Sequence, residues 1–541
     1  METSIFDIPL LKEEITQYLL LRDLARCVLV SKEWNAWFTP NMWRTIDFTR
    51  KYNNNALARN QDHVRSIASI QLYFDKMPEG LICPNLRSLE LTPLTFNYKH
   101  DEGKTLRLAS HAPSLQSLVM RSIRDADSFF LEELFDTLKR LPMLTKLELH
   151  FSHLVKPGSI QRIIENCRHL KSFHLSCESN TPSMIPALPY VQVHEPEHQL
   201  ETVKDGLDRL KCVQIQELSI RVASTEQESA ILIPLLEKCH LLERLDLLRI
   251  HSTATMQQVS RVLATESRPR LKHLRIGSSS VESDTTAELL RVVGYEGEGE
   301  CTESKDQGGL QTLIISHYSC FYQSIFKALP QYHSNTLTEL DFCHRTITAK
   351  DLNYFLSGLP KLQAFRAKIP LEFKKDDEAP FGKIFSSSSP WACLGMRKLN
   401  LEVEVSGNVS RNYGSGWTDS PESQLMQYIF WHIGTLTALE EFRFTSRMNL
   451  LTTDGYLWLL GGLKGLRTLS LQTYHGRVTP STSDIKWMLE HWPRLEYFQL
   501  DAGFIPGWSP RSKKKLPRNL VIKELQTGRP WLQITIGHRL L

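Results

Sequence analysis

The chain has 541 residues, more than the ~250–300 at which a single hydrophobic core stops growing, so it folds as several domains or as an array of repeats. Hydrophobic residues make up 41% and charged residues 23%, which excludes a largely disordered chain. The net charge of +4 is small for a dedicated nucleic-acid binder, and the ten cysteines include no Cys-x-x-Cys pair, so neither a disulfide framework nor a zinc finger is indicated.

The first residues do not have the composition of a secretory signal peptide. Glu2 and Asp7 stand where such a peptide carries positive charge. The apolar runs of the chain are far shorter than the ~20 residues that cross a bilayer. We therefore expect a protein that does not contact a membrane and that resides in the cytoplasm, the nucleus or both.

Residues 1–48 are predicted to form a small unit of three short helices. Ile15 and Leu19 share a face of the first helix, Asp23 suits the N-cap of the second, and Ser31 suits the N-cap of a third that carries Trp34. A unit of this size is marginally stable alone. It is therefore expected to dock on a partner or on the rest of the chain.

A six-residue pattern, apolar-x-x-apolar-x-apolar, recurs through the rest of the chain. Copies without an insertion between them start 26 to 29 residues apart. This spacing resembles the leucine-rich repeat, in which each copy is a short strand and a return helix. A degenerate first copy is assigned to Ile67, Ile70 and Leu72. The clear copies begin at Leu86, Leu115, Leu144, Leu170, Ile215, Leu242, Leu271, Leu310, Leu337, Leu362, Met396, Leu439, Leu466 and Leu495.

The segments between copies predict the return helices. Helical spacing of apolar residues indicates helices at 128–141, at 351–359 with Asp351 as N-cap, and at 453–463 with Thr453 or Asp454 as N-cap. Alternating strands and helices predict an α/β leucine-rich-repeat solenoid, a horseshoe with a parallel concave sheet and convex helices, attached to a small all-α N-terminal module.

Four stretches break the period and are expected to be inserted loops. A helix is expected to persist within the second of them, at 287–293. The loops are residues 176–211, 278–309, 369–395 and 402–424. The resulting domain prediction is a helical module at 1–48, a repeat solenoid at 49–505, and a basic segment with a C-terminal cap at 506–541, the cap drawing on 520–522 and 531–536.

The residue between the last two apolar positions of each copy points away from the core, because side chains alternate along a strand. This column mixes acidic, basic and neutral side chains, which suits a protein surface better than a phosphate backbone. A neighbouring column adds Arg121, His150, Lys368 and Glu402. An inner face that is only solvated, with binding at loops or a rim, is left open. The predicted target-binding residues are Glu148, His174, Asp246, Arg275, Asp341, Arg366, Asn400 and Arg443.

None of the common enzyme motifs considered is present in the sequence in the context that its chemistry requires. His194 and His198 bracket an H-E-x-x-H string, but Pro196 breaks the helix that this zinc motif needs. The chain has no P-loop and no G-x-S-x-G nucleophile motif. The basic run at 511–518 is either a solvated charge cluster or a nuclear or RNA-contacting signal. We expect no enzyme activity, no metal site and no cofactor.

The N-terminal segment contains a string with regularly placed residues, DLARCVLVSKEW at 23–34. It resembles the F-box pattern D-L-x-x-x-x-x-V-x-K-x-W at Asp23, Leu24, Val30, Lys32 and Trp34. Upstream of this string, Ile8-Pro9 stands where the F-box has Leu-Pro, although Leu11 replaces a common Glu, and downstream Trp43 matches the trailing Leu-Trp-Arg. With the repeats, the chain resembles the F-box/leucine-rich-repeat family over nearly its whole length.

This resemblance implies an adaptor rather than a catalyst. In that family the F-box binds the Skp-type linker of a cullin–RING (SCF-type) ubiquitin ligase core, and the repeats capture a target protein. About half of the apolar linker residues are expected to lie in the module's own core. The implied linker-binding residues are Ile8, Pro9, Ile15, Leu19, Leu24, Val28, Val30, Lys32 and Trp34. The alternative is a leucine-rich-repeat scaffold or inhibitor whose F-box-like start is only an N-terminal cap.

Overall fold

The structure is a computed structural model. It divides into two compact units, Met1–Arg270 (unit 1) and Leu271–Leu541 (unit 2). The described residues are 9–47, 53–72, 80–93, 101–123, 128–152, 155–177, 213–221, 225–248, 250, 252–265, 271–277, 281–294, 309–316, 323–371, 390–405, 421–446, 455–473, 482–502, 527–536 and 539–540.

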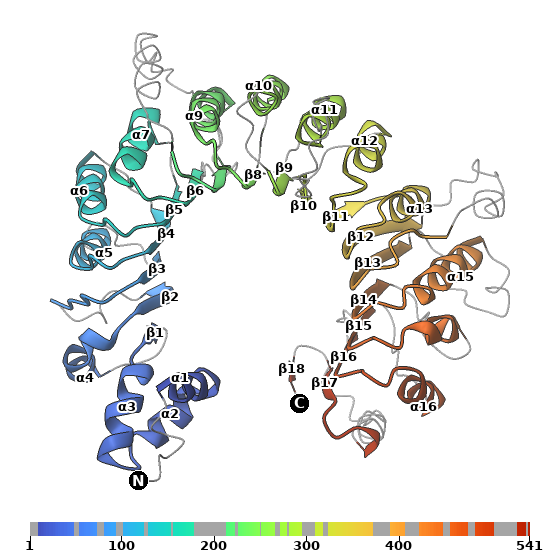
Figure 1. The fold of residues 1–541 in the computed structure, drawn as a ribbon, viewed down its shortest axis with the longest axis horizontal. Helices are drawn as coiled ribbons and strands as arrows, with labels where there is room; N and C mark the ends of the chain where they lie inside the picture. Colours follow the sequence, from blue (N-terminus) through green and yellow to red (C-terminus); the bar gives the residue numbers. More distant parts are fainter. Residues whose placement is uncertain are drawn as a thin grey trace, which may run out of the picture. The chain divides into compact units, whose positions relative to one another are not determined.

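Unit 1 contains a sheet in which strands neighbour one another in chain order, and each is parallel to the next. Successive strands run parallel because a return segment separates them (Figure 1). The strands are β1 (Thr45–Asp47), β2 (Ser66–Leu72), β3 (Ser88–Pro93), β4 (Ser117–Ile123), β5 (Lys146–Phe151), β6 (Ser172–Cys177), β7 (Glu217–Arg221) and β8 (Arg244–Leu248).

The helices that connect the strands of unit 1 lie on one face of its sheet, and three further helices precede β1 (Figure 1). The opposite sheet face is called the open face of unit 1. The helices are α1 (Pro9–Tyr18), α2 (Leu21–Cys27), α3 (Lys32–Met42), α4 (Asn54–Arg59), η2 (Gln61–His63), α5 (Asp101–Ser110), α6 (Ser128–Lys139), α7 (Pro157–Asn166), α9 (Thr225–Lys238) and α10 (Thr253–Leu263).

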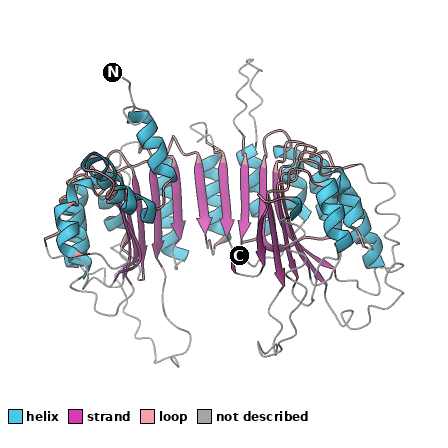
Figure 2. Ribbon diagram, turned by 90° about the horizontal axis from the view of Figure 1, so that it is seen from below, coloured by secondary structure: helices cyan, strands magenta, loops and turns pink. Residues whose placement is uncertain are grey.

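Unit 2 repeats this plan, with its helices on one face of its sheet (Figure 1), and helices and strands form separate layers (Figure 2). All of its neighbouring strands pair in parallel except the last two, which are antiparallel. Its strands are β9 (His273–Gly277), β10 (Thr312–Ser316), β11 (Glu339–Thr346), β12 (Ala364–Leu371), β13 (Lys398–Val405), β14 (Glu441–Ser446), β15 (Thr468–Thr473), β16 (Tyr497–Ala502), β17 (Gln533–Ile536) and β18 (Arg539–Leu540). Its helices are α11 (Ser283–Gly294), α12 (Gln323–His333), α13 (Ala349–Gly358), α15 (Pro421–Gly434), η7 (Leu457–Gly462) and α16 (Thr482–His491).

Equivalent apolar residues of successive copies lie in register. Leu118 of β4 pairs with Leu89 of β3 and Leu147 of β5, and all three are fully buried. Phe442 of β14 lies in the same way between Leu399 and Leu469. Each buried side chain contributes about 1.5–3 kcal/mol, which a single copy could not obtain alone. Both units are segments of a leucine-rich-repeat solenoid, as the sequence predicted.

The array extends beyond both ends of the predicted pattern. Ile67 pairs with Leu89, so it occupies the second apolar position of its copy; Val64 is the first, and the assignment of Ile67 as the first position was wrong. The short strand β1 extends the sheet by one more parallel strand, with buried Ile46 opposite Ile67. At the other end, Ile534 of β17 pairs with Phe498.

Three predicted helix details were wrong. The second helix begins at Leu21, so Asp23 lies in its first turn and is not the N-cap. In α13 the N-cap is Thr348, whose hydroxyl accepts from the Asp351 backbone N–H at 3.1 Å while Asp351 accepts from the Thr348 N–H, forming a capping box. Within the described part of the helix expected at 453–463, residues 455–463, the only helical element is the short 3₁₀ helix η7, and the proposed N-caps Thr453 and Asp454 lie outside the described residues.

Close backbone packing accounts for two glycines at this turn. A Cβ on Gly434, at the end of α15, would lie 2.0 Å from the carbonyl oxygen of Leu459. A Cβ on Gly462 would lie 2.3 Å from the carbonyl oxygen of Gly434. The neighbouring copies approach so closely that only glycine fits at either position.

Three of the four predicted insertions begin later than expected. Ser176, Ile369 and Glu402 still belong to β6, β12 and β13, because these strands continue beyond the last repeat position. The helix expected at 287–293 is part of α11. Most of each insertion lies outside the described residues, as do the basic run at 511–518 and residues 520–522.

Candidate protein-binding surfaces

The helices α1–α3 carry an unusual share of exposed apolar side chains. Of the seventeen large hydrophobic side chains that are exposed in the described residues, eight lie between residues 10 and 30. Leu29 is 83% exposed, Leu10 and Tyr18 are each 78% exposed, and Leu20 and Val30 are exposed by 64% and 63%. Apolar surface gathered on so short a segment is typical of a site that a partner covers.

The structure separates the predicted linker-binding residues into surface and core. Val30 and Lys32 are exposed, and Ile15 is 36% exposed. Leu19, Val28 and Trp34 are half-buried. Leu24 is only 6% exposed and belongs to the core of the helical unit itself.

The remaining predicted residues and the missed ones complete this comparison. Pro9 is the first residue of α1, and Ile8 lies outside the described residues. The more exposed Leu10, Tyr18, Leu20 and Leu29 were missed, although their apolar character was visible in the sequence.

Local interactions hold α2 and α3 together. Ser31 caps α3, its hydroxyl accepting from the backbone N–H of Trp34 at 3.1 Å, as the sequence predicted. The Asn35 side chain donates to the carbonyl of Val28 at 3.0 Å and so ties α3 to the end of α2. The rings of Trp34 and Phe38 lie 5.3 Å apart. Trp34 therefore packs within the helical unit and holds α3 in the position that presents the exposed apolar residues.

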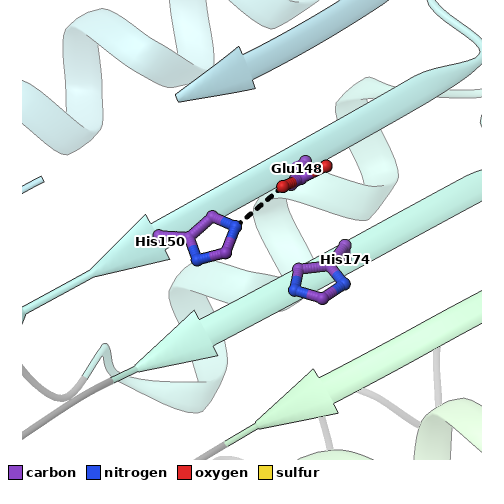
Figure 3. Close-up of side chains that lie close together, drawn as sticks. All are labelled: Glu148, His150 and His174. Carbon is purple, nitrogen blue, oxygen red and sulfur yellow. Dashed lines mark hydrogen bonds and ion pairs between the residues drawn. The ribbon is translucent and has the colours of Figure 1, made fainter. Parts of the chain in front are cut away.

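The open face of unit 1 carries a connected polar cluster over β3–β6. Arg121 lies between two carboxylates, 3.1 Å from Glu90 and 3.5 Å from Glu148. The imidazole Nε2 of His150 lies 2.9 Å from the same Glu148 oxygen (Figure 3). This hydrogen bond lowers the pKa of Glu148 to about 2, with further contributions from the charges of His174, His150 and Arg121.

His174 lies beside this group on the next strand. Its ring stacks on that of His150 with centroids 5.0 Å apart and planes 28° apart (Figure 3). Burial, followed by the charge of His150, lowers the pKa of His174 to about 4, so the ring is neutral at pH 7. Glu148 and His174 are paired across β5 and β6, so these two predicted target-binding residues lie together.

The other predicted residues form rows across the strands. In unit 2, Asp341, Arg366, Asn400 and Arg443 are successive register partners from β11 to β14. Asp341 lies 3.7 Å from Arg366, and Arg443 lies 2.6 Å from Glu441.

Two more predicted residues occupy the equivalent position of their strands, between the last two apolar residues of a copy, but lie outside the group from Asp341 to Arg443. In unit 1, Asp246 of β8 pairs with Ser219 and is largely buried beside Arg244. In unit 2, Arg275 of β9 is half-buried and pairs with Ile314.

The row in unit 2 lines a shallow hollow. Its volume is about 150 Å³, and charged groups on four strands surround it. Small-molecule sites are usually about 300–1,000 Å³, so this hollow suits a side chain of a bound protein better than a cofactor. Beside it, Lys368 lies 3.1 Å from Glu402 and 2.9 Å from Glu404. Although burial opposes the charged form, these hydrogen bonds raise the pKa of Lys368.

Two buried cysteines, Cys167 and Cys239, are not activated as nucleophiles. Burial raises the pKa of the Cys167 and Cys239 thiols to about 12, so neither supplies a thiolate at neutral pH. His194 and His198 lie outside the described residues. Among the helices that the structure describes, none has the length and apolar character needed to cross a membrane.

Comparison with known proteins identifies similar solved folds but no family. No protein-family model matches the chain. No curated protein matches it. An internalin (InlF) from Listeria monocytogenes shares 10% sequence identity at a TM-score of 0.28, covering 85% of this chain and 82% of its own. A chain of the yeast Rad7 and Elc1 complex shares 12% identity at a TM-score of 0.35, covering 99% of this chain and 98% of its own.

Proposed function

We propose that the protein is a non-enzymatic substrate-recognition subunit of an SCF-type cullin–RING ubiquitin ligase, acting in the cytoplasm, the nucleus or both. In this proposal α1–α3 form an F-box that docks the Skp-type linker of the ligase core. The open strand faces bind the protein to be ubiquitinated. The proposal combines the F-box resemblance of residues 4–48 with the leucine-rich-repeat fold.

The observation that carries the proposal is the apolar surface of α1–α3. Leu20, Leu29 and Val30 are more than 60% exposed in the free chain, although each is a residue type that is usually buried. Covering one such side chain fully is worth about 1.5–3 kcal/mol, so a few of them supply a large part of a stable complex. A terminal cap that served only the repeats would not need apolar residues directed to solvent.

The open faces support the second half of the proposal. The open face of unit 1 and the corresponding sheet face of unit 2, opposite its helices, each present acidic and basic side chains on parallel strands spaced about 4.8 Å apart. The four partners from Asp341 to Arg443 place acidic, basic and amide groups side by side. Such a surface provides electrostatic complementarity for a folded protein or a peptide.

Co-purification of the full chain with a Skp-type linker tests the proposal. The double variant Leu20→Asp/Val30→Asp should weaken binding at least about tenfold, since two exposed apolar contacts are lost. Leu20 precedes the first residue of α2, where Asp is a favourable N-cap, so this variant should remain folded. The matched control is Leu241→Asp, which changes a leucine that is 54% exposed and lies between α9 and β8.

The rival function is a scaffold or inhibitor that does not join a ligase. It would be supported if the wild-type chain, mixed with excess linker, eluted alone from a sizing column. The ligase proposal would also fail if the double variant and the Leu241→Asp control bound the linker equally well.

A further inference from the structure

A second chemical feature of the open face of unit 1 is independent of the proposed function. Glu148, His150 and His174 each offer one metal-binding atom, and these three atoms all lie within 4.8 Å of one another. All three residues are half-buried on adjacent strands, with their side chains pointing to the same side (Figure 3). The rigid register of β5 and β6 therefore fixes their backbones before any ion binds.

From this geometry we propose that Glu148, His150 and His174 form a binding site for a divalent cation of the zinc class. Two imidazoles and one carboxylate are a ligand set that Zn²⁺ uses when a fourth position remains open to water or to a bound molecule. Mg²⁺ and Ca²⁺ prefer an all-oxygen set and are expected to bind weakly. The open position would point away from the sheet, toward solvent.

The distances require only side-chain adjustment. Tetrahedral Zn²⁺ with bonds of about 2.0–2.1 Å holds its ligand atoms about 3.4 Å apart. Nε2 of His150 and Oε1 of Glu148 are already 2.9 Å apart. The two imidazole rings are nearly parallel, with planes 28° apart, so one ring must turn about its Cβ–Cγ bond for both nitrogens to face one ion. The half-buried position of His174 leaves this rotation open.

Arg121 is the group that opposes the ion. Its Nε lies 3.5 Å from the Glu148 carboxylate, where its charge repels a second cation. The same guanidinium also lies 3.1 Å from Glu90, so it has an alternative partner when the Glu148 oxygen turns to a metal. Removal of the Arg121 charge should therefore tighten binding, whereas a change that acted only through folding would not.

The test is titration of the full chain with Zn²⁺ by isothermal calorimetry, and with Co²⁺ by visible absorption. We expect one site whose Co²⁺ bands show four-coordinate geometry. His150→Asn and His174→Asn should each weaken Zn²⁺ binding at least about tenfold, since even residues that only support a metal ligand cost about 10–100-fold. Arg121→Gln should tighten it about threefold to tenfold.

Two controls locate the binding. His169→Asn changes an exposed histidine just before β6 and should leave the affinity unchanged. The double variant His194→Asn/His198→Asn removes the H-E-x-x-H string and should also leave it unchanged. The proposal is overturned if the wild-type chain binds no Zn²⁺, if His150→Asn and His174→Asn bind like wild type, or if binding is lost only in the His194/His198 variant.

Discussion

His333 at the end of α12 should make unit 2 sensitive to mild acid. The residue is fully buried, and its Nε2–H donates to the Leu290 carbonyl of α11 at 2.9 Å. Burial lowers the pKa of His333 from 6.5 to about 4, although the hydrogen bond partly opposes this shift. Above pH 6.5 neither the folded nor the unfolded chain carries the proton. Between pH 6.5 and 4 only the unfolded chain binds it, so stability falls as the pH falls.

The size of the effect follows from the two pKa values. Between pH 7.5 and pH 5 the shift should cost about 2 kcal/mol of unfolding free energy. The perturbation is His333→Gln, whose amide N–H can still reach the Leu290 carbonyl but does not titrate. The assay is equilibrium urea unfolding followed by intrinsic tryptophan fluorescence; most of the eleven tryptophans lie in unit 2, among them the buried Trp391 and Trp492.

Comparison of the two proteins isolates this residue. The stability of wild type relative to His333→Gln should fall by about 2 kcal/mol over that pH range, because other titrating groups are common to both. Parallel pH profiles for the two proteins would refute the reasoning, since they would show that the ring is not sealed between α11 and α12.

Three further predictions concern stability. Leu147→Ala should lower the free energy of unfolding, measured by heat or urea, by about 2–5 kcal/mol, because it leaves a cavity between adjacent repeats. Lys146→Ala on the same strand should change it by no more than about 0.5 kcal/mol. Equal effects of the two variants would contradict the strand register. Gly434→Ala should destabilise the fold by more than the 1–3 kcal/mol that is roughly typical of overpacking, because the added Cβ collides with the backbone of Leu459. An unchanged melting temperature would exclude this close approach. Thr348→Ala should cost about 1 kcal/mol by loss of the α13 cap, and Thr348→Ser should restore most of it.

The repeat could be predicted because its signal is local and repeated. Each rung shows the same three apolar positions, and the buried column from Leu89 to Leu245 follows directly from them. The ends were missed for a different reason. Ile46 and Ile534 also stand in the pattern, at Trp43-x-x-Ile46-x-Phe48 and Trp531-x-x-Ile534-x-Ile536, but these segments were assigned to the helical module and to the C-terminal cap. Pairing with β2 and β16 places both residues in the repeat array.

The surfaces could be predicted only in part. Alternation along a strand places Glu148 and His174 in one column, but the approach of His150 to both depends on side-chain rotation, which spacing does not encode. The metal-ligand motifs sought in the sequence, Cys-x-x-Cys and H-E-x-x-H, have their ligands three or four residues apart, whereas this cluster combines residues of two strands. On α1–α3, burial of Leu24 and exposure of Leu20 and Leu29 depend on how short helices pack, which apolar character alone does not determine.

Hydrogen–deuterium exchange of the full chain, with and without a Skp-type linker, tests the proposed function most directly. We predict that the linker slows exchange in peptides from α1–α3, where the exposed apolar side chains become covered, and leaves strands β10–β16 unchanged. Unchanged exchange in α1–α3 at saturating linker, or protection confined to the strands, would contradict the proposal that these helices dock the chain onto a ubiquitin ligase.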